Sequence, residues 1–98
     1  MKFAQIIEFE TSRIDEFNAN FDTWMANSEG HRIPHQAVLR KDRDAENVYL
    51  LMVEFASYEI AMENSSRPET GEFAAFLSTL CDGPLSFRNL DVLREEDL

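Results

Sequence analysis

The sequence is poor in cysteine, glycine, proline and lysine, and these shortages exclude several classes of protein. Cys81 is the single cysteine, so the chain cannot form an internal disulfide bond or a cysteine-based metal cage. Three glycines are too few for the glycine-rich loops that cradle phosphates. The sequence therefore predicts no metal site and no cofactor, and a chain with one thiol is expected in the reducing cytoplasm.

Basic residues are also scarce. Nineteen acidic residues face nine basic ones, which gives a formal net charge of −10 at neutral pH. Nucleic-acid binding needs a clustered basic surface, and anionic membranes attract basic segments. No run approaches the roughly 18 apolar residues that a membrane-spanning helix needs, and Glu8 comes too early for a signal-peptide core. The sequence predicts neither a nucleic-acid partner nor membrane association, and the acidic charge is expected to serve solubility.

The chain does contain enough apolar material for one core. Its 98 residues are 44% hydrophobic and include eight phenylalanines. This length corresponds to a single domain, spanning residues 1–98, but a domain so small leaves much of its surface exposed. Burial through self-association is therefore expected to add stability.

Four segments have the residue alternation of β-strands: Lys2–Glu10, His35–Lys41, Val48–Phe55 and Leu85–Arg94. Val48–Phe55 is the strongest of them, because apolar side chains occupy both of its faces until Glu54. A small antiparallel sheet with helices on one side normally shows polar residues on the other. The pattern therefore predicts that something covers the second face.

Two helical regions separate these strands. The first is predicted to begin at an N-cap on Ser12, with Asp15 completing a capping-box-like pattern, and to end at a left-handed Gly30. The second is predicted to break before Pro68, because proline disfavours helical geometry in the residue before it. Its end is expected at a left-handed cap on Gly83.

The order of these elements is β-α-β-β-α-β, which predicts an α+β fold of the ferredoxin-like type. Right-handed crossovers place both helical regions on one face of a four-stranded antiparallel sheet. Large exposed apolar patches are rare on monomers. We therefore expect a homodimer in which the open sheet faces of two copies close on each other about a two-fold axis.

The element order, the two-sided strand Val48–Phe55 and the run Phe55–Ser65 with Arg67 and Pro68 after it resemble the dimeric α/β-barrel superfamily. Within it, the chain is most similar to the antibiotic biosynthesis monooxygenase-like proteins, and the similarity covers nearly the whole chain. The resemblance implies a dimeric α/β barrel that handles an apolar or aromatic small molecule. It further implies a cofactor-free monooxygenase acting on an aromatic or polyketide-like compound; the alternative is a non-catalytic dimerisation or ligand-sensing module.

Three polar residues are candidates for catalysis. His35 begins a predicted strand at a predicted pocket mouth, where a histidine can move protons near neutral pH; the alternative is an exposed loop histidine. Asn64 and Arg67 lie where the second helical region breaks, a region that borders the cavity in the resembling families. Arg67 is suited to hold a carboxylate or phenolate oxygen. The alternative is that this polar cluster satisfies free backbone groups at a helix end.

Aromatic residues supply candidates for substrate binding, namely Trp24, Tyr49 and Phe73. They are predicted to line a pocket for an aromatic ligand. An aromatic stripe at helical spacing is more often plain core, so packing is the competing interpretation.

Overall fold

The computed structural model describes all residues from 1 to 98. Its elements are β1 Phe3–Glu10, α1 Ile14–Asn27, β2 Gln36–Lys41, β3 Val48–Phe55, α2 Tyr58–Ser65, α3 Pro68–Leu80 and β4 Ser86–Asp91. The order matches the predicted one, and the second helical region is split into α2 and α3. The split falls just before Pro68, which occupies the first turn of α3.

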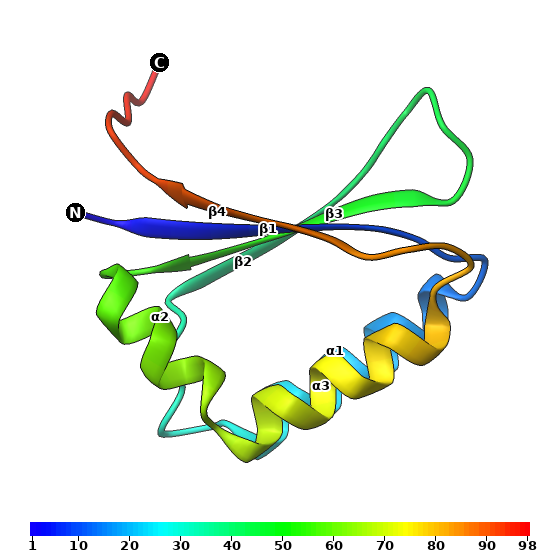
Figure 1. Ribbon diagram of the computed structural model, residues 1–98, viewed down its shortest axis with the longest axis horizontal. Helices are drawn as coiled ribbons and strands as arrows, with labels where there is room; N and C mark the ends of the chain where they lie inside the picture. Colours follow the sequence, from blue (N-terminus) through cyan, green and yellow to red (C-terminus); the bar gives the residue numbers. More distant parts are fainter.

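The four strands form one antiparallel sheet in the order β2-β3-β1-β4. All three helices lie on one side of this sheet, and its other side is uncovered (Figure 1). The predicted ferredoxin-like α+β fold is therefore confirmed. No helix has the length and apolar character needed to cross a membrane.

The main core lies between the sheet and the helices. Phe9 of β1 stacks on Phe17 of α1, with ring centroids 5.1 Å apart, and on Tyr49 of β3 at 5.8 Å. Leu77 and Leu80 of α3 complete the same cluster and are almost fully buried. These residues recur at every second position of the strands and at helical spacing in α1 and α3, which is why one face of each element is buried.

The other side of the sheet is apolar at its centre, as the pattern of β3 predicted. We call this surface the open face, and its residues are Ala4, Ile6, Val38, Leu50, Met52 and Leu90. The pairing of Ile6 with Met52 and of Val38 with Met52 places these side chains next to one another. Leu90 remains 41% exposed. Within a single copy, no helix covers these side chains.

The start of α1 differs from the prediction. Its N-cap is Arg13, without a side-chain cap, so the capping box expected at Ser12 and Asp15 is wrong. The Ser12 N–H instead donates to the Asp82 carboxylate at 2.9 Å. Thr11 is fully buried; its hydroxyl donates to the Leu80 carbonyl and accepts from the Arg13 N–H. Contacts with the distant end of α3 therefore fix this corner.

Other boundaries shift by a few residues. Gly30 does have a left-handed backbone, with φ of +83°, but α1 already ends at Asn27. The left-handed cap expected at Gly83 is wrong, because α3 ends at Leu80 and Cys81 turns the chain into an extended conformation. β2 and β4 are shorter than predicted, although the His35 and Val92 N–H groups continue the pairing one residue beyond them by donating to the Glu54 and Lys2 carbonyls.

Candidate functional site

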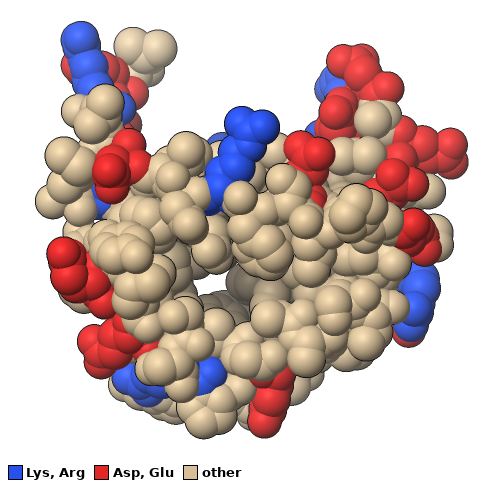
Figure 2. Space-filling model, in the orientation of Figure 1, with Lys and Arg blue, Asp and Glu red and all other residues tan.

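A cavity of about 110 Å³ lies between the sheet and the helices. Every strand and every helix contributes to its lining, together with Pro34 from the segment before β2. Figure 2 shows an opening in this region, surrounded by uncharged side chains. The break between α2 and α3, and the small residues Ala37 and Ala74 in the lining, leave this space unfilled.

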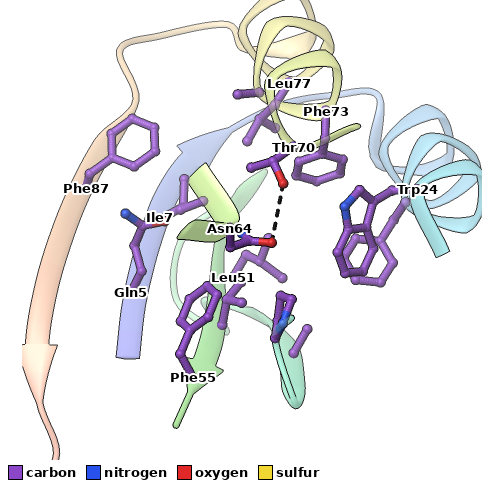
Figure 3. Close-up of a pocket in the computed structure, with 15 residues that line it drawn as sticks. Gln5, Ile7, Trp24, Leu51, Phe55, Asn64, Thr70, Phe73, Leu77 and Phe87 are labelled. Atoms are coloured by element: carbon purple, nitrogen blue, oxygen red, sulfur yellow. Dashed lines mark hydrogen bonds between the residues drawn. The ribbon is translucent and has the colours of Figure 1, made fainter. Parts of the chain in front are cut away.

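Aromatic side chains form much of the wall (Figure 3). They are Phe21 and Trp24 of α1, Phe55 of β3, Phe73 of α3 and Phe87 of β4. The Phe21 ring lies 5.3 Å from that of Trp24 and meets Phe73 edge to face at 5.8 Å. Such a lining offers flat apolar surfaces at several angles, which suits a planar aromatic ligand.

Three polar side chains, Gln5, Asn64 and Thr70, interrupt this wall. The Thr70 hydroxyl donates to Asn64 Oδ1 at 3.4 Å, which leaves the Asn64 amide N–H groups as donors. The Gln5 amide nitrogen donates to Asn89 Oδ1 on β4 at 3.2 Å. Figure 3 shows this nitrogen on the side away from Trp24 and Phe73, so Gln5 presents its oxygen as an acceptor. The cavity thus offers one amide donor and one amide acceptor.

No charged residue lines the cavity, although 29% of the chain is charged. The lining also lacks histidine, cysteine and tyrosine. Placing an ion in such surroundings is costly, whereas hydrogen bonds there are stronger than in water. The cavity is therefore suited to the neutral part of a ligand.

A second hollow, which we call the outer pocket, adjoins the cavity and has a volume of about 210 Å³. It is lined by Phe21, Trp24, Met25, Arg32, Pro34, His35, Gln36 and Ala37. Phe21, Trp24, Pro34 and Ala37 belong to both linings. The outer pocket therefore lies next to the cavity, beside α1 and β2.

The structure brings together part of the predicted site. Asn64, Trp24 and Phe73 line the cavity, and His35 lines the outer pocket. Tyr49 is buried against Phe9 in the packed core, away from the cavity lining. Arg67 is the half-buried N-cap of α3 and is also absent from the lining. The roles of these residues in binding or catalysis stay predictions.

Sequence reasoning missed Gln5, Thr70 and Phe87. Gln5 did carry a signal, because it is the one polar residue among the inward-facing positions of β1 near Phe3 and Ile7. Thr70 and Phe87 carried none, since a threonine in a first helical turn and a phenylalanine in a strand are ordinary. Their place in the wall depends on how the elements pack.

His35 forms part of an ion-pair chain at the end of the sheet where β1 and β2 begin and β3 ends. Its Nε2 lies 2.8 Å from Glu54 Oε1, and Lys2 Nζ lies 3.3 Å from the same oxygen. Lys2 Nζ also contacts Glu95 at 2.7 Å. Hydrogen bonding from His35, supported by Lys2, holds the pKa of Glu54 below its ordinary value of 4.5 against the opposing effect of burial.

The low pKa of Glu54 predicts a loss of stability in acid. A carboxyl whose pKa is lowered by folding contributes stability above its unfolded pKa and loses it as the pH falls through the folded value. We expect the free energy of unfolding to fall below about pH 4.5, and less steeply in Glu54→Gln. Urea unfolding near pH 7 and near pH 3 measures this. The exposed Glu63→Gln is the matched control, and an equal acid loss in wild type and Glu54→Gln would contradict the assignment.

Comparison with known proteins finds likeness in structure but not in sequence. No protein-family model and no curated protein sequence matches the chain. The structure of Rv0793 from Mycobacterium tuberculosis superposes with a TM-score of 0.78 and 17% identity, covering 99% of this chain and 100% of that one. SnoaB, a cofactor-independent oxygenase from Streptomyces nogalater, superposes in an asparagine-to-alanine variant with a TM-score of 0.80 and 15% identity, covering 96% and 95%.

A proposed antibiotic biosynthesis monooxygenase from Caulobacter crescentus gives a TM-score of 0.79 at 14% identity, covering 95% of this chain and 91% of that one. Identities at this level show a shared fold. The fold is that of the antibiotic biosynthesis monooxygenase-like proteins, as the sequence resemblance predicted. In this chain, the structure groups no three histidine, cysteine, aspartate or glutamate side chains around a point where a metal ion could bind.

Proposed function

We propose, from the fold shared with antibiotic biosynthesis monooxygenases, that this protein binds a planar aromatic, polyketide-like compound in the cavity and oxidises it with dioxygen without a prosthetic group. The observation that carries the proposal is the cavity wall, in which five aromatic rings surround a few uncharged polar groups. A fold by itself does not determine a reaction, so the argument depends on these side chains.

The polar groups select for oxygen substituents on the ligand. The Thr70 hydroxyl occupies the amide oxygen of Asn64. The Asn64 amide N–H groups remain free to donate to a carbonyl or phenolate oxygen of the ligand. The Gln5 oxygen is free to accept from a hydroxyl, because Asn89 accepts from its amide nitrogen. A hydroxylated aromatic ketone supplies both partners, and an unsubstituted hydrocarbon supplies neither.

The proposed reaction balances with dioxygen as the sole oxidant. A ring methylene flanked by aromatic rings becomes a carbonyl, using one oxygen atom of dioxygen. The second oxygen atom leaves as water with the two hydrogens of the methylene. The substrate thereby supplies all the electrons that dioxygen takes up, so no external reductant is consumed.

Asn64 is the proposed catalytic residue. No titratable side chain lines the cavity, so the methylene proton passes to solvent water, and its loss places negative charge on the conjugated carbonyl oxygen. A hydrogen bond from the Asn64 amide stabilises that charge. The bond is stronger here than in water, because the mostly apolar lining has a low dielectric constant. In support, SnoaB is a cofactor-independent oxygenase whose structure was solved with an asparagine replaced by alanine, and Asn64 is the one asparagine in this cavity wall.

The test uses a dihydroxyanthrone, which has the carbonyl, the hydroxyls and the reactive methylene. Protein should accelerate its conversion to the anthraquinone, with one dioxygen consumed for each product. Label from oxygen-18 gas should appear in the new carbonyl. Oxygen uptake no faster than that of the compound alone in buffer would overturn the proposed oxygenase activity.

The second candidate function is binding without turnover, as in a ligand-sensing module. The absence of any titratable side chain from the cavity lining favours it, because no group there can accept the substrate proton directly. The same experiment separates the two functions. Saturable binding of the anthrone without added oxygen uptake would identify a binding module.

We propose that the functional unit is a homodimer closed through the open face. Its central residues, Leu50, Met52 and Ile6, are apolar and only partly covered in one copy. The open face of a second copy would bury them. A two-fold axis places the apolar centre of one open face against the apolar centre of the other.

Leu50→Asp should therefore convert the dimer into a monomer. A carboxylate in the middle of a dry interface has no partner and is costly to bury. Light scattering after gel filtration measures the mass, and circular dichroism checks the fold. Ala19→Asp, on the exposed surface of α1, introduces the same group and should leave the dimer intact. A dimeric Leu50→Asp protein would exclude this face as the interface.

A further inference from the structure

We propose that Arg32 binds a carboxylate of the ligand in the outer pocket beside the cavity, so that the substrate class is an aromatic carboxylic acid. This inference rests on the proposed aromatic binding in the cavity. It adds an anchoring site in the outer pocket, whose lining does not include the proposed catalytic residue Asn64.

Contacts with α1 and with the segment after it hold Arg32 in the outer pocket. Its Cζ lies 5.6 Å from the ring centroid of Trp24, which is part of both linings. Its Nη2 donates to the Met25 carbonyl at 2.9 Å, and its Nε donates to Ser28 Oγ at 3.2 Å. Stacking and two hydrogen bonds thus orient the guanidinium before any ligand arrives, which limits the entropy lost on binding.

The charge of Arg32 has no acidic partner. Lys2, Arg13 and Arg94 each pair with a glutamate, whereas Arg32, like the other five basic residues, has no carboxylate within ion-pair distance. Arg32 differs from those five in that it lines the outer pocket. The outer pocket also contains no aspartate or glutamate in its lining. The two hydrogen bonds leave both N–H groups of Nη1 and one of Nη2 free to bind an anion.

The two hollows divide a ligand into a neutral part and a charged part. The uncharged cavity disfavours an ion, so an aromatic ring enters it while a charged substituent stays outside. Trp24 lines both hollows, and Arg32 lies against its ring. A short substituent on a ligand ring bound beside Trp24 therefore extends towards Arg32. A single planar guanidinium matches the single charge and flat shape of a carboxylate. The neighbouring His35 is already engaged by Glu54.

A purely structural explanation exists for Arg32, because it donates to a carbonyl in the last turn of α1. Such a role predicts that its loss changes stability and weakens every ligand equally. An anchoring role predicts that its loss weakens acids alone. Comparing the affinities of acidic and neutral ligands therefore distinguishes the two roles, and the affinity of a single ligand does not.

The experiment measures the affinity of naphthylacetic and naphthylbutanoic acids and of their methyl esters by calorimetry. Wild-type protein should bind the better acid about 10-fold more tightly than its ester, as one charge-assisted contact allows. Arg32→Gln should reduce the ratio to near one, and Arg32→Lys should restore part of it. The acid's affinity should fall with added salt, and the ester's should not. Thermal melting of each variant monitors the fold.

Each outcome decides a point. Equal wild-type affinity for acid and ester would overturn the role of Arg32 and leave aromatic binding in the cavity standing. An acid preference that survives Arg32→Gln would also overturn it. Binding of neither the acids nor the esters would overturn both this inference and the proposed aromatic site.

Discussion

Phe17→Ala should lower the free energy of unfolding by about 3–5 kcal/mol, the usual cost of removing a fully buried phenylalanine. Phe17 is only 2% exposed and lies at the centre of the core. Its ring stacks on Phe9 at 5.1 Å and meets Phe73 edge to face at 5.7 Å. Truncation leaves a void that rigid aromatic neighbours cannot fill. Urea denaturation followed by circular dichroism gives the value.

Phe87→Ala is the matched control for this prediction. It removes the same ring from a position that is 52% exposed, so its loss should cost well under half as much. Phe87 also lines the cavity, and its removal should weaken aromatic ligands while the fold survives. Equal losses of stability in the two variants would contradict the placement of Phe17 in the core.

Asn64→Ala should lower kcat for anthrone oxidation by about 10²–10³-fold, the effect of removing one donor from a site that stabilises developing negative charge. Asn64→Asp should lose as much, because it keeps an acceptor for Thr70 but removes the amide donor. Ser65→Ala changes the next residue, which is exposed and outside the cavity lining, and should retain wild-type turnover. Steady-state oxygen uptake measures all three.

Two results would contradict this role of Asn64. One is an Asn64→Ala protein with normal folding and unchanged kcat. The other is an Asn64→Asp protein as active as wild type, which would show that an acceptor suffices at this position. Melting temperatures of the variants separate loss of chemistry from loss of structure.

Most of the fold could be predicted because its signals are local. The alternation in β1 and β3, and the position of Pro68 at the start of α3, fix the element order without knowledge of distant contacts. The caps could not be predicted in the same way. Thr11, rather than Ser12, organises the start of α1, because its hydroxyl bonds to the Leu80 carbonyl far along the chain. A contact of that kind is absent from any local pattern.

The candidate site was predictable by residue type and less so by position. Asn64, Trp24 and Phe73 do line the cavity. Tyr49 is aromatic like Trp24 and Phe73, but the register of the sheet pairs it with Phe9, so it lies in the packed core. The antiparallel pairing of β2 with β3 likewise brings His35 to Glu54, with which it forms an ion pair at the end of these strands. Only packing of all elements decides which inward-facing residues border empty space.

We expect the space between the sheet and the helices to bind an aromatic compound, and the fluorescence of Trp24 reports such binding. Trp24 is the single tryptophan of the chain and lies in the cavity wall. A dihydroxyanthrone or a naphthylacetic ester should change this fluorescence saturably. Ala74→Leu, which fills the cavity, should abolish the change, and Ala75→Leu, one residue away and outside the lining, should preserve it. Fluorescence that does not respond in wild type, or responds equally in both variants, would contradict the claim.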